Sequence, residues 1–149
     1  MVANRSVTAD SVLPHITYRN VAEAATCLAA KFGFTEHYRY GPPSAPSGAQ
    51  MYLGDAWVML DAPDDDQQTT AELGYGTQSL TVFVPDVDAH YESAKSAGAT
   101  IVEDLHDTMD GERQYGARDL DGHHWLFSAH ARDVSPAEWG ATIATKPPR

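Results

Sequence analysis

The sequence predicts an α+β fold in which one βαβββ module occurs twice, forming a cupped mixed sheet with helices on its convex side. Three observations lead to this prediction. An alternating strand ends at Asn20 and a helix-like stretch follows, and the same order recurs at Asp86. Glycine closes the helical stretch in both copies. Each copy then finishes on a short apolar strand, at 56–60 and 124–128. Two such modules side by side would make a hollow that suits a small molecule.

The first module is expected over residues 11–62. Asn20 can cap a helix over 21–32, where apolar residues recur at i, i+3 and i+4 spacing, and Gly33 ends it. The Gly- and Pro-rich stretch 41–48 can form only a loop. The strands of this module are expected at 12–19, 35–40, 49–53 and 56–60, with a hairpin turn at Gly54-Asp55 between the last two.

Residues 63–77 are polar and include the run Asp64-Asp65-Asp66, so they are expected to form a linker loop. The second module follows over 78–130. The flanking segments are a loose leader at 1–10 and a tail at 131–149, in which Ser135 begins a capping-box pattern for a short helix. The second module is predicted to contain strands 79–84, 99–104, 112–119 and 123–129, helix 86–97 and a turn at Asp121-Gly122.

Composition narrows the classes of function. The formal net charge of −11 argues against nucleic acid and anionic membranes as partners, because both recruit basic patches. The same charge modestly favours a neutral or cationic ligand. No segment is long and apolar enough to cross a membrane. The single cysteine, Cys27, excludes an internal disulfide and fits a cytoplasmic location; we expect it to be a buried packing residue.

Alternation along the strands assigns side chains to the two faces of the sheet. We expect Ile16, Tyr18, Phe83, Trp125 and Phe127 to pack away from the hollow, and Leu80, Val82 and Val84 to face it. The alternative for each aromatic side chain is that it simply fills the core. The candidate pocket is His15, Thr17, Tyr52, Trp57, Val82, Tyr115, His124, Leu126 and Ser128. Such a mostly apolar hollow would suit a flat or hydrophobic molecule.

Several stretches resemble the vicinal oxygen chelate superfamily, which contains glyoxalase I, extradiol dioxygenases and bleomycin-resistance proteins. The resemblance covers about residues 11–140, and the tail from Asp133 to Glu138 is similar to a mostly uncharacterised glyoxalase-like subgroup. It implies the paired βαβββ fold, but it is a poor guide to the reaction. The stretches that carry it are Tyr18-Arg19-Asn20-Val21, Lys31-Phe32-Gly33-Phe34, Val87-Asp88-Ala89-His90-Tyr91, Ala97-Gly98-Ala99 and Ala117-Arg118-Asp119-Leu120-Asp121-Gly122-His123-His124-Trp125.

The resemblance implies four metal ligands, one from the first and one from the last strand of each module. Here these positions fall on Leu13, Met59 or Leu60, Leu80 and Leu126, so the usual site is expected to be absent. A shifted site would use His15 and His124 as weak candidate ligands, with Asp61 or Glu103 completing it. The alternative is that both imidazoles are polar walls of a pocket, or that one acts as a base.

The other histidines are expected to be structural or exposed. His123 lies in the Asp-Gly-His turn and is predicted to stabilise it. His90, His106 and His130 are predicted to lie at the surface. The sequence contains no G-x-S-x-G motif, no phosphate loop and no dinucleotide glycine fingerprint.

Three functions remain open. The leading one is a metal-independent binding protein of the bleomycin-resistance type, cytoplasmic and homodimeric by analogy, that sequesters an aromatic or drug-like metabolite. The alternative is an enzyme: a metal-dependent lyase, isomerase or dioxygenase with shifted ligands, or a cofactor-free enzyme with a histidine base. The third is a scaffold whose hollow is closed.

Overall fold

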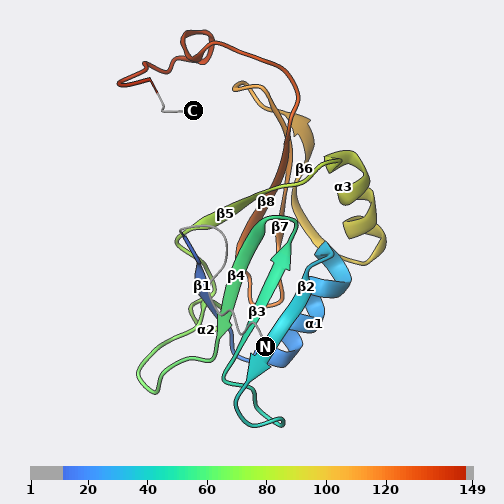
Figure 1. The fold of residues 1–149 in the computed structure, drawn as a ribbon, viewed down its shortest axis with the longest axis vertical. Coiled ribbons are helices and arrows are strands. Elements are labelled where there is room, and N and C mark those ends of the chain that lie inside the picture. Colours follow the sequence, from blue (N-terminus) through green and yellow to red (C-terminus); the bar gives the residue numbers. More distant parts are fainter. Residues whose placement is uncertain (1–11, 147–149) are drawn as a thin grey trace, which may run out of the picture.

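The computed structural model describes residues 12–146, and within them two βαβββ modules follow one another (Figure 1). The predicted leader at 1–10 and the last three residues of the tail lie outside the described residues. The first module comprises β1 (His15–Thr17), α1 (Val21–Phe32), β2 (Thr35–Tyr40), β3 (Gly48–Leu53) and β4 (Ala56–Asp61). The second comprises β5 (Ser79–Phe83), α3 (Val87–Ser96), β6 (Thr100–Asp107), β7 (Glu112–Arg118) and β8 (His124–His130).

Each module forms its own four-stranded mixed sheet. The strand orders are β1-β4-β3-β2 and β5-β8-β7-β6. In both sheets the first strand of the module pairs in parallel with the last, and the other pairings are antiparallel. Helices α1 and α3 lie on the same side of the molecule (Figure 1). The predicted fold class, two βαβββ modules in an α+β fold, is confirmed.

Helix α1 has the predicted bounds, and α3 is one residue shorter at each end than the predicted helix 86–97. The Asn20 side chain accepts a hydrogen bond from the Glu23 amide, and the Asp86 side chain accepts one from the Ala89 amide. Gly33 ends α1 with a φ of 79°, a left-handed conformation that glycine adopts without strain. The predicted apolar face of α1 is buried: Val21, Ala24, Ala25, Leu28 and Phe32.

One hydrophobic core serves both modules. Phe32 at the end of α1 stacks on Phe127 of β8, with ring centroids 5.1 Å apart. Phe34 meets Trp125 edge to face at 5.3 Å. Polar contacts join the modules as well, because the Arg19 amide donates to Asp121 Oδ2 at 2.7 Å. The two sheets therefore fold as parts of a single core.

The prediction of which side chains of β5 face the hollow is wrong. Val82 is only 4% exposed and belongs to the core, whereas Phe83 is 66% exposed. Parallel pairing sets this arrangement, since Leu80 lies opposite Trp125 and Val82 opposite Phe127, both on the core side of β8. The more apolar face of β5 thus turns inward. On β1 and β8 the predicted faces are confirmed, because Ile16, Tyr18, Trp125 and Phe127 are buried.

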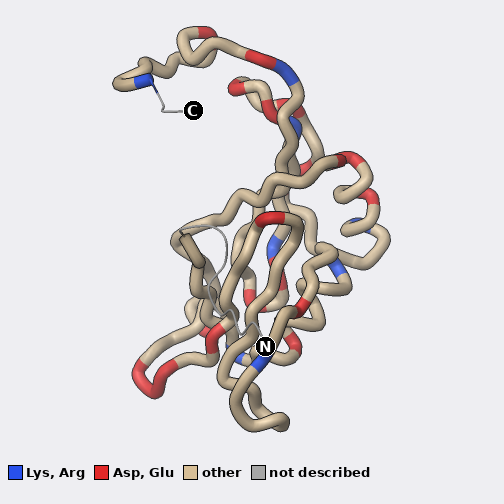
Figure 2. The backbone as a smooth tube through the Cα atoms, in the orientation of Figure 1, with Lys and Arg blue, Asp and Glu red and all other residues tan. Residues whose placement is uncertain are grey.

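The segment between the modules, predicted to be a loop, contains a short helix, α2 (Thr70–Leu73). Its first turn has a capping box between Thr69 and Glu72. The acidic run 64–66 lies on the exposed loop that leads into it (Figure 2). After β8, residues 131–146 extend away from both sheets and include the predicted short helix, a 3₁₀ turn at Pro136–Trp139 (Figure 1). Among the helices of residues 12–146, none combines the length and apolarity needed to span a bilayer.

Candidate functional site

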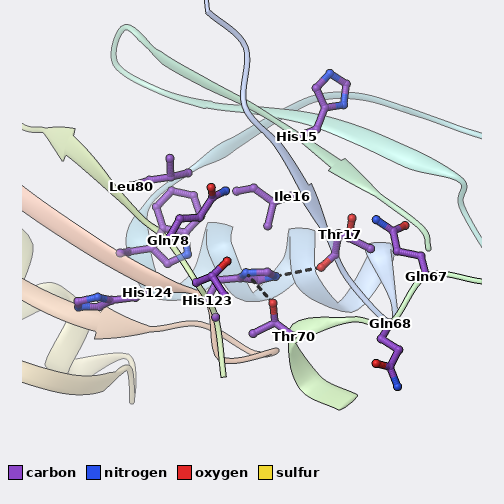
Figure 3. Close-up of a pocket in the computed structure, with 13 residues that line it drawn as sticks. His15, Ile16, Thr17, Gln67, Gln68, Thr70, Gln78, Leu80, His123 and His124 are labelled. Atoms are coloured by element: carbon purple, nitrogen blue, oxygen red, sulfur yellow. Dashed lines mark hydrogen bonds between the residues drawn. The ribbon is translucent and has the colours of Figure 1, made fainter. Parts of the chain in front are cut away.

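A cleft of about 260 Å³ separates the edge strand β1 of the first module from β5 and β8 of the second (Figure 3). We call it the edge cleft. The expected linker forms one of its walls, so that this segment is part of the site. Its lining is polar, which differs from the mostly apolar hollow that was expected. The lining residues are His15, Ile16, Thr17, Gln67, Gln68, Thr70, Gly76, Thr77, Gln78, Leu80, His123, His124 and Trp125.

His123 holds the edge cleft together from within. Its Nε2 lies 2.9 Å from the carbonyl oxygen of Thr17, and its Nδ1 lies 3.3 Å from Thr70 Oγ1 (Figure 3). Because a carbonyl only accepts, Nε2 carries the proton and Nδ1 accepts from the Thr70 hydroxyl. The side chain of His123 therefore has a structural role, but it joins the turn to β1 and α2, whereas the sequence predicted that it stabilises the turn itself.

His15 lies at one end of the edge cleft and forms a pair with Asp61. His15 Nδ1 is 2.8 Å from Asp61 Oδ2, and the two residues come from the first and last strands of the module. When Nδ1–H donates this hydrogen bond to the carboxylate, the lone pair of Nε2 is available to a ligand, a proton or a metal. Both residues also line a second depression of about 610 Å³, together with Tyr40, Ser47 and Gln67.

His124 lies at the opposite end of the edge cleft from His15 (Figure 3). The two imidazoles therefore line one cleft, as expected, but they do not converge. Within residues 12–146, three buried side-chain atoms have no hydrogen-bond partner: His124 Nε2, Ser128 Oγ and Glu112 Oε2. Leaving such an atom unsatisfied typically costs about 1–3 kcal/mol, so each of the three is a position where a water molecule, ligand or partner would be stabilising.

The strand register places all three on the sheet face that carries no helix. Ser128 lies opposite Gln114 and Phe83, His124 opposite Arg118, and Glu112 opposite His130. We call this the open face of module 2. Leu126, another predicted pocket residue, is half-buried on the same face.

The corresponding open face of module 1 is aromatic. Tyr52 stacks on Trp57 with ring centroids 4.7 Å apart, and His37 meets Trp57 edge to face at 5.5 Å. Tyr38 extends the cluster, since its hydroxyl lies 3.7 Å from Met59 Sδ. Tyr52, Trp57 and Tyr38 are only half-buried. Tyr52 and Trp57 are predicted pocket residues. His37 and Tyr38 are not, because a register shift between Glu36 and Tyr38 interrupts the alternation on β2 that the prediction relies on.

Two predicted pocket residues belong instead to the core. Val82 is buried on the core side of β5, and Tyr115 is fully buried on β7. The Tyr115 hydroxyl bonds to His90 Nδ1 at 2.7 Å, and His90 Nε2 donates to the carbonyl of Phe32 at 2.8 Å. His90 is therefore a bridge between the modules and not the expected surface residue. Burial lowers the pKa of His90 and raises the pKa of Tyr115.

The remaining expected surface residues are placed as follows. His106 pairs with Glu103 at 3.1 Å and His130 with Asp133 at 2.9 Å, both in partly or fully exposed positions. Cys27 is half-buried on α1, where burial raises the pKa of its thiol. A raised pKa reduces the thiolate fraction and with it the reactivity of the thiol.

The side chains present do not fit a four-ligand metal centre. Leu13, Met59 or Leu60, Leu80 and Leu126 offer three aliphatic side chains and at most one thioether, and Leu80 packs against the core with Trp125. Across residues 12–146, no group of three or more His, Cys, Asp or Glu side chains is close enough to hold a metal ion. We therefore derive no step through a metal.

Comparison with known proteins gives consistent results. Residues 9–127 match the family model of the glyoxalase/bleomycin resistance protein/dioxygenase superfamily. The uncharacterised protein Mb0911c of Mycobacterium bovis is 30% identical over 139 residues, covering 89% of this chain and 91% of its own. The uncharacterised protein Rv0887c of Mycobacterium tuberculosis is also 30% identical, with 82% of its length covered.

Two solved structures illustrate the structural similarity. TioX from Micromonospora sp. ML1 is 29% identical with a TM-score of 0.68, over 85% of this chain and all of its own. A glyoxalase/bleomycin resistance protein/dioxygenase from Alicyclobacillus acidocaldarius has a TM-score of 0.62 at 17% identity, covering 85% of this chain and 95% of its own. At that identity the second similarity bears on the fold alone.

Proposed function

Because the chain belongs to the glyoxalase/bleomycin resistance protein/dioxygenase superfamily, we propose that it is a metal-independent binding protein that sequesters an aromatic or drug-like metabolite. The observation that carries the proposal is the half-buried aromatic cluster on the open face of module 1. Stacked aromatic side chains that remain accessible suit a flat ligand. The aliphatic residues at the expected ligand positions support a mode of binding without metal.

The proposal includes a cytoplasmic homodimer. Within residues 12–146, no helix covers the open face of either module, and residues 131–146 extend away from the sheets (Figure 1). A second copy would cover an open face and enclose the ligand. The net charge of −11 supports a small molecule over nucleic acid as the partner.

Fluorescence and NMR titration with a library of flat aromatic natural products tests the proposal. We expect Trp57→Leu to weaken binding of a hit by about 2- to 12-fold, which corresponds to one aromatic stack of about 0.5–1.5 kcal/mol. Trp139→Leu, in the tail, is the matched control and should leave the affinity unchanged. A library without hits, or hits that bind both variants equally, would contradict the proposal.

The His15–Asp61 pair favours a second candidate function, an enzyme with shifted ligands or a histidine base. Elemental mass spectrometry of protein purified without a metal-binding tag separates the two candidates. Near-stoichiometric metal that is lost in His15→Ala would favour the metal-dependent enzyme. Metal-free protein that still binds aromatic ligands would favour the binding protein.

A further inference from the structure

We infer that a depression beside the edge cleft binds a carboxylate carried on a flat apolar framework, with Arg118 as its anchor. The depression has a volume of about 320 Å³, and we call it the Arg118 depression. It is separate from the aromatic cluster on module 1, so the inference goes beyond the proposed function and does not depend on it. Three features carry the inference: the walls of the depression, the guanidinium that lines it, and the charges around that guanidinium.

The walls of the Arg118 depression come from module 2 and from the linker. Val102 lies on β6 and Arg118 ends β7, and the register places Arg118 opposite His124 on β8. The turn before β8 and residues 74–76 of the linker complete the walls. Gly76 and His124 also line the edge cleft, in which Figure 3 labels His124. The two cavities are therefore neighbours.

Helix α2 holds the linker wall against module 2. Thr70 Oγ1 lies 3.3 Å from Nδ1 of His123, in the turn that leads into β8. A Cβ at Gly76 would lie 3.6 Å from Cγ2 of Thr70, and a Cβ at Gly122 would lie 3.9 Å from the same atom. These are ordinary van der Waals distances, so the linker and the turn both pack close to one methyl group. Packing and a hydrogen bond therefore fix this wall of the depression.

The guanidinium of Arg118 is free to bind an anion. Arg39 and Arg113 each pair with a carboxylate, at 2.7 and 2.9 Å. Arg118, by contrast, is exposed and has no ion pair among residues 12–146. A guanidinium presents its N–H donors in a planar fork that matches the two oxygens of a carboxylate. Because a guanidinium stays charged at physiological pH, this anchor is always present.

No like charge competes with a bound anion in this depression. Its described lining contains no Asp or Glu. Asp119 and Asp121, which follow Arg118 in the sequence, are only 8% and 5% exposed and accept hydrogen bonds from residues of module 1. Glu103 on β6 pairs with His106 at 3.1 Å. The carboxylates of this region are therefore already partnered.

The local charge outweighs the net charge of the protein at this position. The net charge of −11 repels anions at long range, but 0.1 M salt screens such repulsion beyond about 10 Å. A carboxylate in contact with Arg118 lies well inside that distance. Because the described lining holds no second Lys or Arg, one guanidinium balances one negative charge. A carboxylate fits this balance better than a phosphate group, which carries about −1.5 to −2 at pH 7.

Two apolar side chains would contact the rest of the ligand. Tyr75 is 62% exposed and Val102 is 42% exposed, and both line the same depression as Arg118. A ring attached to a carboxylate on Arg118 would lie beside them, and an accessible tyrosine ring favours a flat partner. The ligand class is therefore an aromatic acid or another flat acid.

Three small probes test the inference by NMR titration of the full chain: 3-phenylpropanoate, its neutral amide 3-phenylpropanamide, and phenyl phosphate. We expect 3-phenylpropanoate to bind roughly ten-fold more tightly than the amide, and at least as tightly as the phosphate. Arg118→Gln should remove the preference for the carboxylate over the amide. Arg118→Lys, which keeps the charge and loses the planar fork, should retain part of it. Lys146→Gln removes the same charge from the exposed tail and should preserve it.

Equal affinities for 3-phenylpropanoate and its amide, a preference that survives Arg118→Gln, or no binding of any probe at millimolar concentration would each overturn the inference. Tighter binding of phenyl phosphate than of 3-phenylpropanoate would overturn the choice of a carboxylate. Binding that is weakened by Trp57→Leu and not by Arg118→Gln would place the probe on the aromatic cluster of module 1. That result would overturn this inference and leave the proposed function standing.

Discussion

Asp119 shows how one buried carboxylate joins the two modules. Its Oδ2 accepts from the Tyr18 hydroxyl and from Trp125 Nε1, the latter at 2.9 Å. Its Oδ1 accepts from the backbone amides of Asp121 and His123 at 3.2 and 3.0 Å. These four hydrogen bonds stabilise the buried negative charge of Asp119, and they also satisfy the donors of the buried Tyr18 and Trp125 side chains. Asp119 therefore anchors the turn that positions His123 and His124 at the edge cleft to Tyr18, the residue that follows β1.

His90 should make the free energy of unfolding depend on pH. Burial lowers its pKa in the folded state, whereas in the unfolded chain the pKa is about 6.5. Below that value the unfolded chain binds a proton that the folded protein does not yet bind. The free energy of unfolding that this neutral imidazole contributes is therefore fully present above about pH 6.5, and it is lost as the pH falls toward the folded pKa. Urea unfolding between pH 7.5 and 5.5 measures the effect.

We expect His90→Gln to lose less stability over this range than the unsubstituted protein. The glutamine amide can still donate to the Phe32 carbonyl and accept from Tyr115, but it does not titrate. The other histidines contribute equally to both proteins. Parallel stability curves in the two proteins would show that His90 does not govern the acid sensitivity.

At the scale of the elements, predictions from sequence succeed where a pattern is local. The caps at Asn20 and Asp86, the turn at Gly54-Asp55 and the apolar stripe of α1 are all set by neighbours in the chain. The face of β5 is not, since Leu80, Val82 and Val84 are apolar on one side and Phe83 is apolar on the other. Pairing with β8, far along the chain, decides between them.

The candidate site follows the same rule. The His15–Asp61 pair depends on the parallel register of β1 and β4, in which Thr17 lies opposite Asp61, and no local pattern reveals it. By contrast, α2 had a local signal, because Thr69 and Glu72 form a capping-box pattern in the sequence.

Thr69 offers a test of how α2 shapes the edge cleft. Its side chain is 1% exposed and caps the helix through the Glu72 amide at 3.3 Å. Thr69→Ala should reduce the free energy of unfolding by about 1 kcal/mol and loosen the wall that carries Thr70. Hydrogen exchange of residues 70–74 should then be faster, while Thr69→Ser, which keeps the hydroxyl, should resemble the unsubstituted protein. Unchanged exchange in Thr69→Ala would mean that packing alone holds α2 in place.

At the scale of the whole molecule, the long helices α1 and α3 lie on one side of the sheets (Figure 1), and half-buried side chains such as Trp57 and Leu126 lie on the other. Phe83 is 66% exposed on the open face of module 2, so a second copy that covered this face would contact its ring. If a second copy covers this face, a charge at position 83 should disrupt the pairing.

We expect Phe83→Asp to shift the protein from dimer to monomer in sedimentation equilibrium over a range of concentrations. Burying an unpaired carboxylate at an interface is strongly unfavourable, whereas the same carboxylate on a monomer stays hydrated. Leu120→Asp is the matched control: Leu120 is 42% exposed beside the outer surface of α1, on the side that carries the helices. A dimer that persists in Phe83→Asp but dissociates in Leu120→Asp would place the interface on the helical side. The open faces would then be left free for ligand in each chain on its own.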